Sequence, residues 1–184
     1  MKALLNIIVV FILISFVSGC KNKTNQDVKN KEQTVKPVDI DFDIVLTGTY
    51  MSQEADSICG EEPMIRVVNQ GTGFGVHFGK LISYFDFCVD TSDGTYPQDY
   101  MEAYLEDQNG DRIFIRISGQ VLQGRDPQMP EDAISYFIDP IDIIGGTGIF
   151  EGATGSGVTS DYNSSKDPYS HHRWKGTITL KKGV

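Results

Sequence analysis

Residues 100–118 read YMEAYLEDQNGDRIFIRIS, and they contain the clearest structural signal of the chain. Apolar and polar side chains alternate on both sides of Asn109-Gly110, and a period of two is typical of strands that bury one face. Asn-Gly between two such runs is the strongest short signal for a β-hairpin, because both central residues of its turn adopt positive φ. The stretch therefore predicts two antiparallel strands, whose apolar residues are Met101, Ala103 and Leu105 in one and Ile113, Ile115 and Ile117 in the other.

The same period of two recurs along the chain. It is seen in residues 41–47, and again near the C-terminus, where Trp174, Ile178 and Leu180 share one face. Two polar stretches that contain proline, Gln123–Asp132 and Tyr162–His171, are predicted to be loops. Further strands are predicted near Met64–Asn69, Lys80–Asp90, Ile134–Ile138 and Ser156–Asp161. About eight short strands with frequent turns favour an all-β barrel or sandwich, and a barrel also removes exposed strand edges.

The first 20 residues have the three parts of a secretion signal. Lys2 is their only charge, residues 3–17 are almost wholly apolar, and small residues precede Cys20. This end resembles the lipobox of bacterial lipoproteins, in which cleavage between Gly19 and Cys20 leaves a diacylglycerol-bearing cysteine as the new N-terminus. A transmembrane anchor is the alternative, but the apolar run is shorter than the roughly 20 residues that a membrane span needs.

This interpretation divides the chain into three parts. Residues 1–19 are the signal peptide, and residues 20–37 form a lipidated, flexible tether with too little apolar surface to order itself. Residues 38–184 form one β-barrel domain. We expect the protein in the cell envelope, outside the cytoplasm, and in the outer membrane where two membranes exist, because Lys21 is not an acidic retention signal.

The chain is acidic. Sixteen Lys and Arg against 25 Asp and Glu give a net charge of −9, and loss of Lys2 with the signal leaves 15 against 25, or −10. An acidic surface repels phosphate backbones, so we expect no nucleic-acid partner. It also gives no attraction to anionic lipid, so the acyl chains must supply the membrane attachment.

The three cysteines predict one disulfide. If Cys20 carries lipid, Cys59 and Cys88 remain, and an even remainder in an oxidising compartment favours a bond between them. Two buried free thiols or a pair of metal ligands are the alternatives.

Residues 145–157 read GGTGIFEGATGSG. Glycines permit positive φ and close backbone approach, so we expect a tight structural corner with Phe150 as an apolar plug at one end of the barrel. A nucleotide site is not favoured, because Glu151 stands where the pattern G-x-G-x-x-G requires glycine and no helix follows. The residues assigned to the corner are Gly145, Gly146, Gly148, Phe150, Gly152, Gly155 and Gly157.

This run resembles the GGTGxFxGATGSG signature of small bacterial barrels similar to allene oxide cyclase and dirigent proteins. Weaker similarities to these barrels occur at 75–80, 87–90, 109–114 and 174–178, in the order expected for such domains. Together they span most of residues 40–182. The resemblance implies an eight-stranded antiparallel β-barrel of calycin-like architecture. It does not imply the cyclase reaction, because no catalytic residue of the plant enzymes can be placed on this sequence.

Two sets of side chains were weighed as metal ligands. His171-His172 with His77 could bind zinc across strands, but solvated loop histidines explain them better. Asp139, Asp142 and Glu151 could bind Ca²⁺, but turn-capping carboxylates are the simpler explanation. The sequence therefore predicts no metal, no cofactor and no catalytic residue.

These observations predict a noncatalytic, lipid-anchored envelope protein that binds a small apolar molecule or a protein partner. A cyclase or isomerase acting in the barrel cavity is the alternative, and a purely structural module is a third. A cavity with apolar walls and one or two buried ionisable groups would favour a binder or an enzyme. A barrel filled by side chains would favour the structural module.

Overall fold

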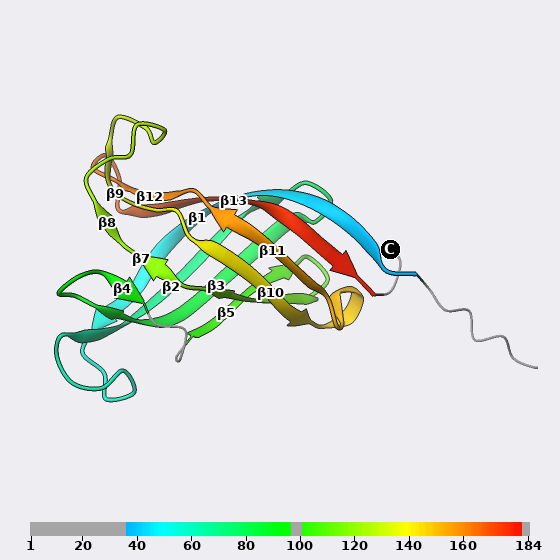
Figure 1. Cartoon of the computed structure of the whole chain (residues 1–184), viewed down its shortest axis with the longest axis horizontal. Coiled ribbons are helices and arrows are strands. Elements are labelled where there is room, and N and C mark those ends of the chain that lie inside the picture. Colours follow the sequence, from blue (N-terminus) through cyan, green and yellow to red (C-terminus); the bar gives the residue numbers. More distant parts are fainter. Residues whose placement is uncertain (1–35, 97–100, 182–184) are drawn as a thin grey trace, which may run out of the picture. The chain divides into compact units, whose positions relative to one another are not determined.

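The protein is a closed eight-stranded antiparallel β-barrel, as the sequence predicted (Figure 1). The structure is a computed structural model and describes residues 36–96 and 101–181. Neighbouring strands pair in sequence along most of the barrel, and β1 closes it by pairing with β13, from Val38 opposite Leu180 to Thr49 opposite Tyr169. The barrel strands are β1 (Val38–Glu54), β2 (Met64–Gly75), β3 (Gly79–Asp90), β5 (Met101–Asp107), β6 (Arg112–Ile117), β10 (Pro140–Gly146), β11 (Thr154–Thr159) and β13 (Tyr169–Leu180).

Five short strands lie at the end of the barrel opposite to the turn between β10 and β11 (Figure 1). Three of them extend the sheet beyond β13, in the order β12, β9, β8, and the other two, β4 and β7, pair with each other. The one short helix among the described residues is the 3₁₀ turn η1 (Gly148–Phe150). The short strands are β4 (Thr95–Tyr96), β7 (Gly119–Gln120), β8 (Leu122–Gln123), β9 (Ala133–Phe137) and β12 (Asp161–Ser164).

The predicted hairpin joins β5 to β6, but its turn differs from the expected type. Gly110 has a φ of +84°, whereas Asn109 is not among the residues with positive φ. The carboxylate of Asp107 accepts hydrogen bonds from the backbone N–H groups of Asn109 and Asp111, at 2.8 and 3.0 Å. A side-chain cap of this kind holds a four-residue loop with a single left-handed position, so the two-residue turn was the wrong type.

Two other expectations from the sequence were wrong. Only residues 165–168 of the predicted loop Tyr162–His171 form a loop, because Tyr162 and Asn163 of β12 pair with His171 and Ser170 of β13. Strand β10 was missed altogether. Pro140 begins it and glycines end it, which hides a strand from a search for alternating side chains.

Cys59 and Cys88 form the predicted disulfide, with a Cα–Cα distance of 5.5 Å. Cys88 is buried in β3, and Cys59 belongs to the loop before β2. Arg66 of β2 lies beside this bond and pairs with Asp86 (2.5 Å) and Asp56 (3.0 Å). The loop before β2 is therefore fixed to the barrel by one covalent bond and by an ion-pair network.

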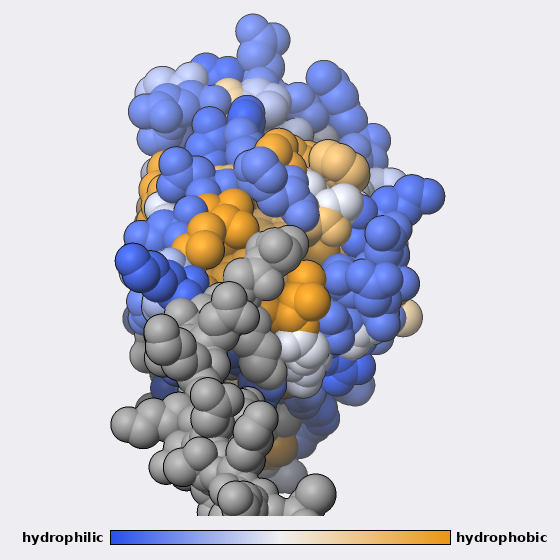
Figure 2. All heavy atoms as spheres, turned by 90° about the vertical axis from the view of Figure 1, so that its right-hand side faces the viewer, coloured by the Kyte–Doolittle hydropathy of each residue, from blue (hydrophilic) through white to orange (hydrophobic). Residues whose placement is uncertain are grey.

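One half of the barrel, here called the packed half, is filled by side chains. Its remaining space is about 10 Å³, hardly enough for one water molecule. Phe150 of η1 is 2% exposed and lies edge-on to Phe78, with ring centroids 5.8 Å apart. Figure 2 shows the end of the barrel at which β13 finishes, where hydrophobic residues (orange) lie among hydrophilic ones (blue) on the surface. Further side chains around this remaining space are Phe42, Ile44, Leu105, Ile113, Ile115, Ile141, Ile143 and Trp174.

The glycine run forms the end of β10, the turn η1 and the start of β11. Gly148 (φ +55°) and Gly152 (φ +69°) are the left-handed positions of the turn. A Cβ on Gly148 would lie 1.8 Å from the carboxylate of Asp111, which also accepts a hydrogen bond from the backbone N–H of Ile149. The carboxylate of Asp111 thus occupies the backbone N–H group that a phosphate would need, and its negative charge repels anions from the turn.

The predicted lipidation site, Gly19 and Cys20, lies outside the described residues, as does most of the predicted tether. Within the described ranges, the structure has no helix that is long and apolar enough to cross a membrane.

Candidate functional site

The half of the barrel next to the short strands is hollow. Its cavity, here called the aromatic cavity, has a volume of about 70 Å³. One water needs at least about 10–15 Å³, so several waters or one small molecule fit without rearrangement. Six aromatic side chains line it, namely Tyr50, Phe85, Phe87, Tyr96, Phe137 and Trp174. The remaining lining residues are Asn69, Met101, Ile117, Thr159, Asp161 and His172.

The aromatic rings contact one another around the wall. The centroid of Phe85 lies 5.5 Å from that of Trp174, and Tyr96 lies 5.7 Å from Phe87 and 6.5 Å from Phe137. Such tilted and edge-on pairs are favourable packing arrangements for aromatic rings. The rings therefore support each other, and the cavity does not depend on a ligand to hold its walls apart.

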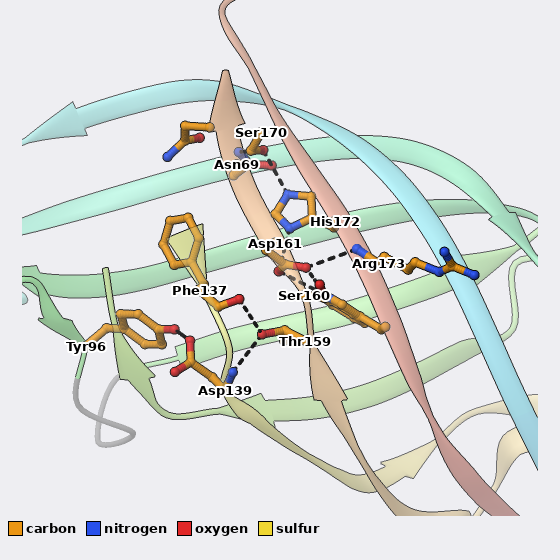
Figure 3. A network of polar contacts seen from close by, with 12 residues as sticks. Asn69, Tyr96, Phe137, Asp139, Thr159, Ser160, Asp161, Ser170, His172 and Arg173 are labelled. Carbon is orange, nitrogen blue, oxygen red and sulfur yellow. Dashed lines mark hydrogen bonds and ion pairs between the residues drawn. The ribbon is translucent and has the colours of Figure 1, made fainter. Parts of the chain in front are cut away.

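Asp161 is the polar centre of the site (Figure 3). It is only 6% exposed, and it accepts hydrogen bonds from the indole N–H of Trp174 (3.0 Å), the backbone N–H of Arg173 (3.1 Å) and Nδ1 of His172 (2.8 Å). A buried carboxylate needs such donors, because burial without them is costly. His172 and Trp174 are two residues apart on β13, so both side chains face the interior beside β12, where Asp161 lies.

A hydrogen-bond chain continues from His172 away from Asp161. Nε2 of His172 lies 2.8 Å from Oγ of Ser170, and Nδ2 of Asn69 donates to the same Oγ at 2.9 Å. Because Nδ1 donates to a carboxylate, Nε2 of a neutral His172 ring accepts a hydrogen bond from the hydroxyl of Ser170. The connectivity is that of a Ser-His-Asp triad, but Ser170 is 1% exposed and does not line the cavity. We interpret the chain as a network that orients His172.

A second buried carboxylate, Asp139, lies beside the cavity (Figure 3). Tyr96 donates its hydroxyl proton to Asp139, whose own backbone N–H donates to Oγ1 of Thr159 at 2.9 Å. Burial raises the pKa of Asp139 to about 6; a hydrogen bond from Gln120 opposes this rise, and the charge of Asp161 adds to it. A Cβ on Gly119 would lie 1.8 Å from this carboxylate, so only glycine leaves it room.

Tyr50 completes the polar groups of the lining. Its hydroxyl donates to Oδ1 of Asn163 at 2.9 Å, and Nδ2 of Asn163 donates to Ser135 at 2.9 Å. Burial, with the charge of Asp161 as a smaller cause, raises the pKa of Tyr50, so it stays protonated at neutral pH. Its hydroxyl is therefore fixed by the protein and is not free for a ligand.

The three histidines have separate environments. His77 has a positive φ of +75° and lies in the turn between β2 and β3. His171 stacks on Tyr162, with centroids 4.7 Å apart, and pairs with Asp167 at 3.1 Å. His172 is partly buried in the cavity wall. Since His171 and His172 both belong to strand β13, the expectation of solvated loop histidines was wrong for both.

The carboxylates weighed for Ca²⁺ also differ from expectation. Asp139 is buried next to Tyr96, whereas Asp142 and Glu151 are exposed. Across the described ranges, no group of three or more His, Cys, Asp or Glu side chains could hold a metal ion.

Asp161 and Ser170 were not predicted as site residues. A signal for Ser170 was present, since Ser170, His172 and Trp174 share a period of two, but Tyr162–His171 was predicted to be a loop. A run of polar residues on the inward face of a strand next to a tryptophan is a usable indication of a polar site inside a barrel.

Comparison with protein-family models, with curated protein sequences and with solved structures found no match for this chain. The barrel, its cavity and the N-terminal sequence are therefore the features that bear on function.

Proposed function

We propose that this protein is a lipid-anchored cell-envelope barrel that binds a small, largely apolar molecule in its aromatic cavity. The observation that carries the proposal is the contrast within one interior: the packed half is filled, whereas the aromatic cavity keeps about 70 Å³ open between preformed walls. A barrel whose only purpose was stability would gain from filling this space, because dispersion contacts are lost around a void.

The lining favours binding of apolar groups. Most polar side chains of the wall are bonded within the protein, through Asp161, Asp139 and Asn163, whereas the buried Oδ1 of Asn69 has no hydrogen-bond partner. A ligand would therefore bury apolar surface without competing for these hydrogen bonds, and burial contributes about 25 cal/mol per Å². Concave, mostly apolar sites with a few placed polar groups are the usual form of small-molecule sites.

The test is native mass spectrometry of the protein purified from its own cell envelope. We expect a retained small molecule in the wild-type protein. We expect its loss in Met101→Trp, because the indole ring is larger than the methionine side chain and would fill the cavity. Ile82→Trp is the matched control, because Ile82 is 51% exposed and lies outside the cavity. Equal retention by both variants would place the bound molecule elsewhere and contradict the proposal.

The anchor is proposed from the sequence alone. Cys20 follows an apolar run and two small residues, and only its thiol could form the thioether to diacylglycerol. We expect Cys20→Ser to leave the membrane fraction or to remain unprocessed, and to incorporate no labelled fatty acid. Labelling of Cys20→Ser at the wild-type level would contradict the proposed anchor.

One observation favours an enzyme of cyclase or isomerase type as a second candidate. Asp139 has a pKa of about 6 and lies near the buried pair of Asp161 and His172, and groups with pKa values near neutrality in apolar sites serve as general acids and bases. A catalytic role predicts that substrate turnover is lost in His172→Phe while the ligand is still bound.

A further inference from the structure

The wall of the aromatic cavity has a definite electrostatic sign. Among its described lining residues none is Lys or Arg, whereas Asp161 lies in the wall and Asp139 is bonded to Tyr96, which also lines it. His172 is the one base in the lining. Even with His172 protonated, one carboxylate in the wall and one behind Tyr96 oppose a single cation, so the site keeps an excess of negative charge whenever both acids are ionised.

Anionic ligands are excluded by the same wall. Each donor atom of the lining has an acceptor in the protein. Trp174 and His172 donate to Asp161, Tyr96 to Asp139, Tyr50 to Asn163, Thr159 to the carbonyl of Phe137, and Asn69 to Ser170 through one of its two amide N–H bonds. An anion would find no Lys or Arg and no donor besides the second N–H of Asn69, so most of its desolvation would go uncompensated. The ligand is therefore neutral or cationic.

The hydrogen bonds of two rings favour a cation over a neutral ligand. The indole N–H of Trp174 and the hydroxyl of Tyr96 both end on carboxylates. Hydrogen bonds polarise one another, and donation to a negative charge increases the electron density of the donating ring. Rings of Trp and Tyr attract cations through their π faces, most strongly where the cation is desolvated, and aromatic cages bind quaternary ammonium groups in this way.

We propose that the aromatic cavity binds a methylated ammonium group, in which apolar methyl groups surround a positive charge. This inference rests on the proposed function and names the chemical class of its ligand. Methyl groups satisfy the apolar walls and need no hydrogen bonds, while the charge is stabilised by the rings and by Asp161. The net charge of −9 adds a long-range attraction for cations.

The experiment is a titration of the full-length protein with three probes of nearly the same shape: choline, 3,3-dimethylbutan-1-ol and 3,3-dimethylbutanoate. Trp174 is the only tryptophan of the chain and lines the cavity, so its fluorescence reports binding directly. We expect choline to bind about tenfold more tightly than the neutral alcohol, and the carboxylate to bind most weakly. The ionic strength is kept constant, because it screens the net charge of the protein.

Asp161→Asn tests the role of the carboxylate, since the amide oxygen still accepts the indole hydrogen bond without carrying charge. We expect the preference for choline over the alcohol to fall severalfold in this variant. Asp43→Asn is the matched control, because it removes one carboxylate from the outer face of β1 and should leave the preference unchanged.

The outcomes separate the two proposals. Equal affinity of wild type for choline and the alcohol would overturn the cationic ligand and leave a small-molecule cavity standing. Saturable binding of none of the three probes would overturn both. Asp43→Asn could reduce the preference for choline as much as Asp161→Asn does. That result would assign the preference to the overall charge of the protein and overturn the proposal of a cation-binding site in the cavity.

Discussion

The two halves of this barrel are built from the same strands, yet one is filled and the other is hollow. On β13, Ile178 lies in the filled interior, whereas His172 faces the aromatic cavity. On β6, Ile115 belongs to the packed half and Ile117 to the cavity. Both halves share the alternation of inward and outward side chains, and the pairing of β1 with β13 closes the barrel along both. The kind of side chain at the inward positions then decides whether the interior is filled by aliphatic chains or left open between aromatic rings.

The hollow half is held together by other means. Hydrogen bonds to Asp161 and Asp139 replace part of the missing apolar contacts, and the disulfide of Cys88 holds the loop before β2 to the outer face of β3. Trp174 borders both halves and separates them. Stability and binding should therefore respond to different sets of substitutions, and the following experiments test that division.

The largest effect is expected from Phe150→Ala in the packed half. Phe150 is 2% exposed, and removal of a ring from a packed core costs about 3–5 kcal/mol of the free energy of unfolding. Chemical denaturation measures it, with Ile149→Ala as the control, because Ile149 is 42% exposed. A Phe150→Ala protein as stable as wild type would mean that this end of the barrel is not a packed core.

The disulfide should rank next. It closes a loop between positions 29 residues apart, and the chain entropy of such a loop corresponds to about 3–4 kcal/mol. We expect the double variant Cys59→Ser, Cys88→Ser to lose this amount in denaturant unfolding, whereas its ligand affinity should change little, because Cys88 and the cavity residue Phe87 point to opposite faces of β3. A double variant as stable as the wild type would contradict this expectation.

Asp139 should give the hollow half a pH dependence. Between about pH 4 and pH 6 the folded protein holds a proton that the unfolded chain has released, so stability falls as the pH rises through this range. A pKa raised from 3.8 to about 6 corresponds to about 3 kcal/mol. We expect Asp139→Asn to remove this part of the pH dependence, whereas Asp142→Asn, at an exposed position, should retain it. Identical stability profiles of wild type and Asp139→Asn would contradict the raised pKa.

The smallest effect is expected on the outer surface. Arg173 donates to Asp43 at 2.8 Å, but its side chain is 54% exposed, and solvent screens such pairs so that they contribute little to stability. Asp43→Asn should therefore change the midpoint of thermal unfolding by a few degrees at most. A loss as large as that from Phe150→Ala would show that closure of the barrel depends on this pair.

The barrel could be predicted from the sequence, because alternation and turn signals are local properties of the chain. Residues 100–118 indicated β5 and β6, and the pattern around Trp174 indicated the end of β13. The even number of cysteines left after Cys20 indicated the disulfide. In each of these cases the side chains carry the information within a few residues, or in a count.

The site could not be predicted, because it depends on register. Asp161 meets His172 only because β12 pairs with β13 at Tyr162 and His171, and no local pattern specifies that pairing. The stretch from Tyr162 has the composition of a loop, and tertiary pairing overrides that preference. Whether an interior is filled or hollow is likewise decided by residues from many strands at once, so Ile117 and Phe137 showed no sign of lining a cavity.

The pairing of β1 with β13 has a consequence for how the chain reaches this state. Val38 and Leu180 are partners, so the first strand of the domain finds its second neighbour only when the last strand is available. Contacts between residues so distant in sequence make folding slow, on a scale of about milliseconds to seconds. Until then one edge of β1 is an open template for other chains. For a chain that emerges N-terminus first, the interval before β13 arrives is the period of greatest risk of aggregation, and any factor that shields β1 would act there.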